Sequence, residues 1–353
     1  MVKSKVWTLK QQFDGQPKSS DFELVDEDLI PSIGSLEWKL LVYFQYCSES
    51  GYEYNTQFYF SEVLVEAEYL SVDPYMRVYK KETGKPMIGS GVGKVLKSAN
   101  TSYKEGQKVF VNAGWRTHAI VSDKHSPYEV RHLPPLGDLP LSAGLGVMGM
   151  PGMTAYFGFI DTCKPKIGET VLVNGAAGAV GSVVGQLAKI KGCTVIGFAG
   201  SKEKCDWLTS LGFDHVFNYK ETDVKTALNK SAPKGVDIYF DNVGGQFTVD
   251  ALPYMNTFGR VLVCGAISTY HDGSPMLMPN PFMFILQKKL TVYGFIVTDV
   301  LNRWNEAFPE MLLWIQQGKL KFRETVTEGF DKMPEAFFSL FSGGNIGKAV
   351  VKV

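Results

Sequence analysis

The chain has 353 residues, of which 45% are hydrophobic and 20% charged, a composition typical of a soluble globular protein with about two domains. Lys and Arg together number 36, as do Asp and Glu, so the formal net charge is zero. This balance argues against a protein that binds nucleic acid or a membrane surface through bulk electrostatics.

Cysteine usage and hydropathy point to a cytoplasmic protein. The five cysteines are scattered and form no Cys-x-x-Cys pair, which indicates reduced thiols rather than a disulfide framework. The first 15 residues are polar and include Lys3, Lys5 and Lys10, so we expect no secretory signal. No apolar run approaches the ~20 residues that span a bilayer.

Residues 1–148 carry the pattern of a β domain. Short runs of alternating polarity, such as 63–70, 91–96 and 107–111, are separated by Gly, Pro and Asn turns. Alternation of this kind favours a mostly antiparallel sheet. We therefore predict a first domain over 1–148.

From about residue 164 the pattern changes to alternating strands and helices. Strand-like runs are expected at 170–174, 194–199, 215–219, 236–242 and 260–266, and helical stretches at 182–191, 206–211 and 224–230. Such alternation predicts βαβ units and a doubly wound parallel sheet, here over 149–318.

The last segment, 319–353, returns to short strands. Residues 322–326 and 349–353 flank a helical stretch at 334–341. Strands this short do not form an independent sheet. We expect the segment to rejoin the first domain.

The strongest chemical signal is a glycine-rich turn between a predicted strand and helix. Ala176-x-Gly178-x-x-Gly181 follows the 170–174 run directly and matches the dinucleotide-binding fingerprint, with Ala in place of the first glycine. The helix N-terminus that follows offers N–H groups to phosphates. The alternative is a tight turn in another kind of α/β protein.

The end of the second strand indicates the type of dinucleotide. NAD-binding proteins usually have an Asp or Glu there for the ribose 2′-hydroxyl. This chain instead has Gly200 and Ser201, followed by Lys202 and Lys204. A hydroxyl and ammonium groups attract a 2′-phosphate, so we expect NADP(H). The alternative is a solvated helix start with ordinary exposed lysines.

Other catalytic patterns are absent. Gly89-Ser-Gly-Val-Gly-Lys94 lacks the spacing and the Ser or Thr of a phosphate loop. There is no Gly-x-Ser-x-Gly elbow or His-Glu-x-x-His helix, and the five histidines have no partners at ligand spacing. We expect no catalytic metal, and therefore chemistry supplied by the cofactor.

Several motifs together resemble one family. The chain is similar to the zinc-independent medium-chain dehydrogenases/reductases over nearly its whole length, in the segments Val72-Asp-Pro-Tyr-Met-Arg77, Gly149-Met-Pro-Gly-Met-Thr-Ala-Tyr156, Gly178-Ala-Val-Gly-Ser-Val-Val-Gly-Gln186, Tyr239-Phe-Asp-Asn-Val-Gly-Gly245, Cys264-Gly-Ala-Ile-Ser-Thr-Tyr270 and Gly344-Asn-Ile-Gly-Lys348.

The resemblance implies a fold and an activity. The fold is a Rossmann domain inserted in a GroES-like β domain, paired into a homodimer through the Rossmann sheets. The activity is NADPH-dependent reduction of the carbon–carbon double bond of α,β-unsaturated ketones and aldehydes. Lipid-like enones such as 15-oxo-prostaglandins and alkenals are expected substrates, and oxidation of the 12-hydroxyl of leukotriene B4 is a related activity.

The resemblance also implies site residues. Lys204 and Tyr219 would bind the 2′-phosphate, and the Tyr270 hydroxyl would donate to the substrate carbonyl oxygen as negative charge develops there. From the sequence alone, a single tyrosine is more often a packing residue. Tyr75 is a candidate for the substrate cleft. The expected cofactor contacts are Gly178, Ala179, Val180, Gly181, Lys204, Tyr219, Asn242, Cys264, Gly265, Ala266, Ile267, Ser268, Thr269, Tyr270, Phe295, Ile296, Val297 and Asn345.

Two segments leave alternatives open. The loop 271–281 is rich in Gly, Pro and Met and would either line an apolar pocket or be an ordinary surface loop. At 32–62 the family has only a short turn, whereas this chain carries an aromatic-rich insert. A splice or gene-model artefact is favoured over a functional insert, because long structureless loops in compact domains are uncommon.

Two other functions compete with enone reduction. A quinone reductase of the same superfamily would share the cofactor turn, but it is not expected to carry Asp73-Pro-Tyr-Met-Arg77 together with Ser268-Thr-Tyr270. A catalytically silent structural or interaction protein, disabled by the insert, is the non-enzyme alternative.

Overall fold

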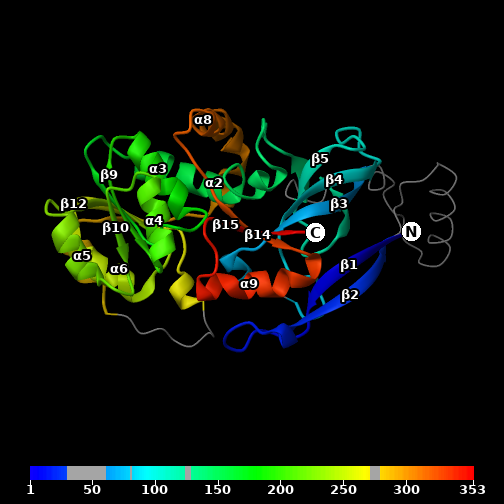
Figure 1. Ribbon diagram of the computed structural model, residues 1–353, viewed down its shortest axis with the longest axis horizontal. Helices are drawn as coiled ribbons and strands as arrows, with labels where there is room; N and C mark the ends of the chain where they lie inside the picture. Colours follow the sequence, from blue (N-terminus) through cyan, green and yellow to red (C-terminus); the bar gives the residue numbers. More distant parts are fainter. Residues whose placement is uncertain (30–60, 80–81, 124–128, 271–278) are drawn as a thin grey trace.

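The computed structural model describes residues 1–29, 61–79, 82–123, 129–270 and 279–353. A parallel sheet with its helices forms one end of the molecule and a mostly antiparallel sheet the other, with α9 between them (Figure 1). In the second sheet only β14 and β15 pair in parallel among the described strands. Nearly all of the predicted insert 32–62, and residues 271–278 of the predicted pocket loop, lie outside the described residues. Both expectations therefore stay predictions.

The parallel sheet has the strand order β10-β9-β8-β11-β12-β13, which confirms the predicted doubly wound α/β fold. Its strands are β8 (Thr170–Val173), β9 (Thr194–Ala199), β10 (His215–Asn218), β11 (Val236–Asp241), β12 (Met255–Val263) and β13 (Thr291–Gly294). Its helices are α3 (Gly181–Ile190), α4 (Lys202–Ser210), α5 (Val224–Ser231), α6 (Gly245–Ala251) and α7 (Phe282–Lys288).

Alternate residues of the central strands enter two separate cores. Val171 and Val173 of β8 belong to one buried cluster, and Leu172 between them belongs to another. Ile238 and Phe240 of β11 likewise face the opposite way from Tyr239. Both faces of the sheet are therefore buried, which explains why its strands appear in the sequence as continuous apolar runs.

The antiparallel part contains a seven-stranded sheet and a separate hairpin. The sheet order is β14-β15-β3-β4-β5-β7, and β6 pairs with β3. Because β15 pairs antiparallel with β3, the C-terminal segment lies in the sheet built by the first part of the chain. The strands are β1 (Val2–Leu9), β2 (Phe22–Leu29), β3 (Glu62–Ser71), β4 (Gly91–Ser98), β5 (Lys108–Val111), β6 (His118–Ser122), β7 (Val130–His132), β14 (Glu324–Glu328) and β15 (Lys348–Lys352).

The remaining helices lie around and between the two sheets. None of the helices in the described ranges is both long and apolar enough to cross a membrane. The other α-helices are α2 (Met150–Ala155), α8 (Trp304–Gln316) and α9 (Met333–Ser342), and η5 (Tyr156–Cys163) is a π-helix. The short turns of helix are η1 (Ser19–Asp21), η3 (Pro74–Arg77), η4 (Leu141–Leu145), η6 (Leu252–Tyr254), η7 (Ile267–Thr269), η8 (Val297–Arg303) and η9 (Phe330–Lys332).

Several predicted element boundaries are wrong. The strand predicted at 260–266 starts five residues earlier and ends at Val263, as β12. Helix α4 begins at Lys202, four residues before the predicted start, because the Ser201 hydroxyl accepts a hydrogen bond from the Lys204 amide and caps the helix. The strand predicted at 322–326 runs instead over Glu324–Glu328, because Phe322 packs against the core of the parallel sheet.

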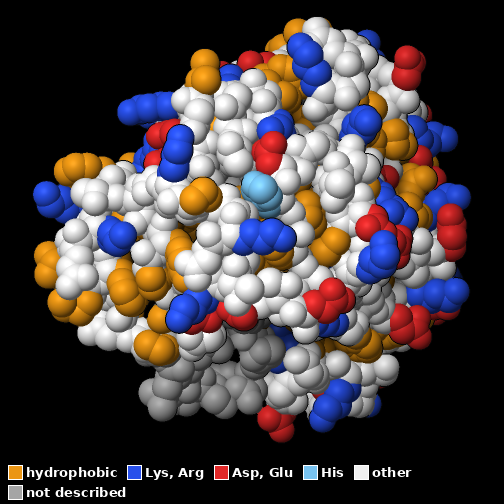
Figure 2. Space-filling view, turned by 60° about the vertical axis from the view of Figure 1, so that its left-hand side comes forward, with side chains coloured by type: hydrophobic (Ala, Val, Ile, Leu, Met, Phe, Trp, Pro, Cys, Tyr) orange, Lys and Arg blue, Asp and Glu red, His pale blue; other side chains and the backbone are white. Residues whose placement is uncertain are grey.

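The outer strand of the parallel sheet leaves apolar side chains exposed. Strand β13 pairs only with β12 among the described strands. Helix α7 contacts β12 and has no fully buried side chain, although Phe284 and Ile285 are partly buried against the core. The end of the molecule turned forward in Figure 2 carries a group of hydrophobic side chains at its left. The exposed apolar residues of α7, of β13 and of the segment after β13, called here the edge patch, are Phe282, Met283, Leu286, Val292 and Ile296.

One aromatic ring sets the spacing between α3 and β9. The ring of Phe213 fills the space that a side chain at Gly185 or Gly197 would occupy, and a Cβ added at Gly185 would lie 1.9 Å from its Cζ. The helix therefore packs close to the sheet only because both positions are glycine.

We predict that Gly185→Ala lowers the free energy of unfolding by about 1–3 kcal/mol, because the added methyl group overpacks a rigid core. Denaturant unfolding measures the change. Lys225→Ala, on the exposed face of α5, is the control and should shift stability by less than about 0.5 kcal/mol. Equal effects in both variants would contradict this packing account.

Candidate functional site

The glycine-rich turn closes tightly between β8 and α3. Gly175 adopts a φ of +54°, and the Gly178 amide donates to its carbonyl oxygen at 3.0 Å. A Cβ at Gly181 would lie 2.6 Å from the same oxygen, so only glycine allows the helix to begin there. The Ser182 and Val183 amides at the start of α3 donate to the Gly178 and Val180 carbonyl oxygens at 3.1 Å each. The positive end of the helix dipole at this N-terminus favours a pyrophosphate next to the turn.

The C-terminal segment contacts the same turn. The Gly347 amide donates to the Ala177 carbonyl oxygen at 2.8 Å, and Gly347 forms a parallel bridge with Gly178. Asn345 donates from its side chain to the Gly347 carbonyl oxygen at 2.8 Å. The predicted contact Asn345 therefore lies in a loop attached directly to the predicted phosphate turn.

The structure separates the two lysines that follow β9. Lys202 is exposed and pairs with Asp206 at 2.7 Å. Lys204 is half-buried and donates to the Gly343 carbonyl oxygen at 2.9 Å. Burial and the nearby Lys220 lower the pKa of Lys204, as expected for an ammonium group held close to another positive charge.

Tyr219 lies beside the same end of β9. Its amide donates to the Ala199 carbonyl oxygen at 3.1 Å, and its hydroxyl would be 2.6 Å from a Cβ at Gly200. The Tyr219 side chain is half-exposed. An exposed hydroxyl and the Lys204 ammonium group thus flank the point at which a ribose 2′-phosphate is bound in folds of this kind.

A buried polar network joins the ends of β8 and β11. The Asp241 carboxylate, 1% exposed, accepts hydrogen bonds from the Asn174 side chain at 2.7 Å and the Gly244 amide at 2.8 Å. Asn174 in turn accepts from the Asn242 amide at 2.6 Å and, on its backbone oxygen, from the Asn242 side chain at 2.8 Å. The sequence pointed to Asn242 but missed Asn174 and Asp241. Both residues could have been found from the sequence, because each is a polar residue at the end of a buried apolar strand.

Tyr270 folds back onto the loop that follows β12. Its hydroxyl oxygen accepts a hydrogen bond from the Ala266 amide at 3.2 Å, and its half-buried side chain lies at the end of the 264–270 segment. The Ser268 hydroxyl donates to the Val243 carbonyl oxygen at 2.6 Å. Since the Tyr270 oxygen accepts here, its own proton can be donated to a substrate.

The other predicted contacts lie along the same edge. The Cys264 amide donates to the Asp241 carbonyl oxygen at 2.8 Å, and burial and the Asp241 charge raise the pKa of the Cys264 thiol to about 12. This thiol therefore stays neutral. The Phe295 amide donates to the Val263 carbonyl oxygen at 3.3 Å; Ile296 is exposed and Val297 is buried. The predicted cofactor residues thus follow the carboxyl ends of the parallel strands, where ligands bind in such folds.

Tyr75 belongs to the antiparallel part of the molecule. It packs against the buried cluster that includes Met76 and Phe337, and its ring meets that of Tyr79 edge-on, with 5.6 Å between centroids. Burial, and next the charge of Asp73, raise the pKa of Tyr75 above its usual value, while a hydrogen bond with Ser90 opposes the rise. Tyr75 therefore stays protonated and can act as a hydrogen-bond donor.

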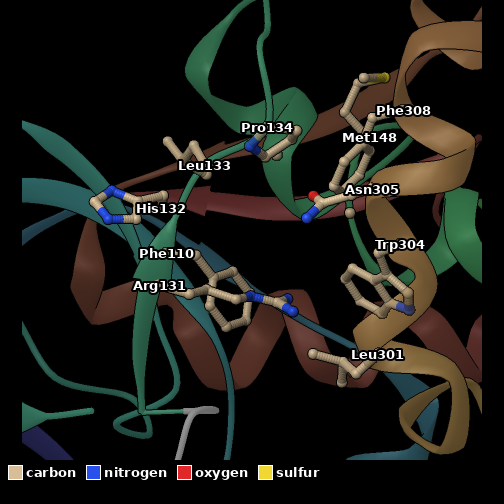
Figure 3. A pocket seen from close by; sticks show the side chains of 12 residues that line it. Phe110, Arg131, His132, Leu133, Pro134, Met148, Leu301, Trp304, Asn305 and Phe308 are labelled. Carbon is tan, nitrogen blue, oxygen red and sulfur yellow. The ribbon is translucent and has the colours of Figure 1, made fainter.

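A cavity of about 240 Å³ lies elsewhere, between β5, β7 and the start of α8 (Figure 3). Arg131 reaches between two aromatic rings, with its guanidinium carbon 4.0 Å from the centroid of Phe110 and 4.4 Å from that of Trp304. None of the predicted site residues lines this cavity. It is therefore separate from the candidate site.

Comparison with known proteins identifies the family. A family model described as "Zinc-binding dehydrogenase" matches residues 179–317, and one described as "N-terminal domain of oxidoreductase" matches residues 56–128. Prostaglandin reductase 1 of Bos taurus is 45% identical over 361 residues, covering 100% of both chains. The chain belongs to the medium-chain dehydrogenase/reductase family. Within it, the chain is close to the prostaglandin reductases.

Two further relatives of this medium-chain reductase have informative names. The 2-alkenal reductase (NADP(+)-dependent) of Nicotiana tabacum is 42% identical over 305 residues, covering 83% of this chain and 88% of that protein. The crystal structure of CurA from Vibrio vulnificus in complex with NADPH is 35% identical, has a TM-score of 0.83 and covers 99% of both chains.

The family model is described as zinc-binding, but the described residues contain no cluster of candidate zinc ligands. Within the described ranges, no three His, Cys, Asp or Glu side chains converge to hold a metal ion. The described residues therefore do not fit a zinc site, and we derive no chemical step through a metal.

Proposed function

We propose that this medium-chain reductase uses NADPH to reduce the carbon–carbon double bond of α,β-unsaturated ketones and aldehydes. One observation carries the proposal: the Tyr270 hydroxyl oxygen accepts from the Ala266 amide at 3.2 Å, in a loop at the carboxyl edge of the parallel sheet. Relatives at 45% and 42% identity are a prostaglandin reductase and an NADP-dependent 2-alkenal reductase, which supports this choice of substrate.

The residues present fit NADPH. The Gly175–Gly181 turn leaves no room for a side chain at Gly181 and presents the N-terminus of α3 to a pyrophosphate. Lys204 and Tyr219 would bind the 2′-phosphate. The CurA structure of Vibrio vulnificus, 35% identical, contains NADPH. When bound, NADPH would supply the hydride that reduces the enone β-carbon.

The chain's own contribution is to orient the enone and to stabilise charge. As the β-carbon is reduced, negative charge develops on the carbonyl oxygen of the substrate. The Tyr270 hydroxyl would donate to that oxygen, a contact typically worth about 3–4 kcal/mol of transition-state stabilisation. The α-carbon then takes a proton from solvent or from Tyr270. Tyr75 would line the substrate cleft.

The enone substrates we propose are 15-oxo-prostaglandins and lipid-derived alkenals, and we extend the proposal to oxidation of the 12-hydroxyl group of leukotriene B4. The test follows NADPH absorbance with a 15-oxo-prostaglandin, a 2-alkenal and a quinone, and NADP⁺ reduction with leukotriene B4. Turnover of the quinone alone would favour a quinone reductase. Folded protein that binds NADPH but reduces none of these compounds would favour a catalytically silent protein.

We predict that Tyr270→Phe lowers kcat for the preferred enone by about 10²–10³-fold, since one donor to the developing oxyanion is lost. NADPH affinity should stay within about threefold, because the rest of the cofactor edge is unchanged. Tyr254→Phe, in η6, is the control. Full kcat in Tyr270→Phe would remove this residue from the chemistry.

We predict that Lys204→Met raises the NADPH dissociation constant by about 10–100-fold, the effect of losing one charge-assisted hydrogen bond to the 2′-phosphate. NADH affinity should not change. Lys202→Met is the matched control, since Lys202 pairs with Asp206 in solvent; it should change NADPH affinity by less than about twofold. Fluorescence titration measures all of these constants. The reverse ranking of the two lysines would contradict the assignment.

The edge patch supports a homodimer paired through the parallel sheets. Phe282 and Leu286 are each 70% exposed, and Val292 lies on an edge strand. An edge strand beside exposed apolar side chains readily pairs with another chain. A second copy of this chain presents the same edge, as a two-fold interface requires.

We predict that Leu286→Lys combined with Val292→Lys converts the dimer to a monomer, because like charges then face one another across the two-fold axis. Light scattering coupled to gel filtration measures the mass. Ile167→Lys, at an 89% exposed apolar residue outside the patch, should leave the dimer intact. A monomeric wild-type chain would refute the proposed interface.

A further inference from the structure

Among the residues that the structure describes, one ion pair is almost completely buried. Lys348 Nζ lies 2.6 Å from Asp73 Oδ1, and the two side chains are 4% and 8% exposed. The proposed function does not use either residue. A buried ion pair is expensive to form, because both charges lose their hydration. Its presence needs a reason beyond stability, since well-packed apolar residues would stabilise the fold as well.

The pair is held in one geometry by further hydrogen bonds. Lys348 Nζ also donates to the Val72 carbonyl oxygen at 2.9 Å, and the Ser71 hydroxyl donates to Asp73 Oδ2. The Val72 amide donates to the Ala349 carbonyl oxygen at 3.4 Å. Three successive residues of the 71–73 segment are thus fixed to the start of β15 or to the pair itself.

Each partner is next to a different part of the proposed site. Lys348 follows Gly347, whose amide donates to the Ala177 carbonyl oxygen in the phosphate turn at 2.8 Å. Asp73 precedes η3, which carries Tyr75, and its carbonyl oxygen accepts from the Met76 amide at 3.2 Å. A chain of direct contacts therefore connects the phosphate turn to the Tyr75 segment. It passes through Gly347, the adjacent Lys348 and the ion pair with Asp73.

The far end of η3 is attached to the same C-terminal segment. The Arg77 guanidinium lies 5.1 Å from the ring centroid of Phe341 in α9, and it donates to the Gln16 side chain at 3.0 Å. Helix α9 leads directly into the 343–347 loop, where Gly343 accepts from Lys204. Both ends of η3 thus contact elements that also contact predicted cofactor residues.

We propose that Lys348 and Asp73 are positioning residues that couple the cofactor turn to the substrate loop. When the phosphate turn is occupied, Gly347 and Lys348 are held in place, and the ion pair fixes the η3 backbone and so the placement of Tyr75 in the cleft. The inference rests on the proposed function and deepens it: NADPH binding orders the enone site through this pair. Lys348 and Asp73 themselves touch neither substrate nor cofactor.

The test uses the full chain and the double variant Lys348→Met with Asp73→Asn, which removes both charges and leaves neither unpaired. Hydrogen–deuterium exchange is measured at residues 75–79 with and without NADPH. In the wild type, NADPH should slow this exchange by about fivefold or more, because the segment is ordered by cofactor binding. In the double variant the slowing should disappear while NADPH still binds within about threefold of wild-type affinity.

Steady-state kinetics give a second measurement on the same proteins. The double variant should raise KM for a 2-alkenal by about tenfold and leave kcat within about threefold, as expected when only substrate binding is disturbed. The matched control is Arg260→Met with Glu169→Gln, which removes another close ion pair (2.6 Å) at the amino end of β8. The control should behave as the wild type in both measurements.

Three results would overturn the coupling. The first is that NADPH does not slow hydrogen–deuterium exchange at residues 75–79 of the wild type. The second is that NADPH slows this exchange equally in the double variant and in the wild type. The third is that the slowing is also lost in the control variant. If the double variant does not fold, Ser71→Ala, which removes one hydrogen bond to Asp73 and keeps the ion pair, should lose part of the protection; full protection would count against the proposal. A wild type that binds NADPH but reduces no enone would refute the proposed function, and the exchange measurement would still decide the coupling.

Discussion

The buried Asp241 carboxylate ties together the strand ends from which the candidate site is built. Its side chain accepts from Asn174 at the end of β8 and from the turn that follows β11, and its carbonyl oxygen accepts from Cys264 at the end of β12. A charged oxygen 1% exposed is tolerated only when such donors surround it. Because these donors are backbone amides and the side chains of Asn174 and Thr248, the positions of the three loops are set before any ligand binds.

The division of the chain has a consequence for how the site is assembled. The parallel sheet provides the predicted cofactor contacts up to Val297, but Asn345 and the loop that accepts from Lys204 belong to the segment that ends in β15. That segment pairs with β3 of the antiparallel sheet. One short stretch of chain therefore contacts the phosphate turn and also forms part of the sheet that precedes Tyr75. Relative movement of the two sheets would have to distort this stretch.

Local patterns were enough to predict the fold and the phosphate turn. Each of the signals lies within a short window of sequence. They are the apolar runs of the parallel sheet, the glycines of the turn, and Gly200 and Ser201 where NAD-binding proteins usually have Asp or Glu. The resemblance selected Lys204 over Lys202, and the structure places Lys202 in an exposed pair with Asp206. Element boundaries failed where one side chain decided them, as the Ser201 cap did for α4.

The residues missed by the sequence are those whose partners are distant along the chain. Asn174 and Asp241 lie 67 residues apart, and Asp73 and Lys348 lie 275 apart. No periodicity or spacing relates such pairs, because only the sheet topology brings them together. A lysine next to a glycine turn or an aspartate before a proline is ordinarily an exposed residue. Their burial follows from the pairing of β15 with β3, which the sequence suggested only as a return of the C-terminal segment to the first domain.

The charge on Asp73 also bears on the chemistry proposed for the cleft. Asp73 is two residues from Tyr75 and contributes to the rise in its pKa, so its field reaches the place where a substrate would lie. Reduction of an enone builds negative charge on the carbonyl oxygen, and an uncompensated carboxylate nearby would oppose that step. Lys348 Nζ lies 2.6 Å from Asp73 Oδ1 and supplies the opposite charge. The ion pair thus lets Asp73 anchor the segment of Tyr75 as one half of a paired charge and not as an isolated carboxylate.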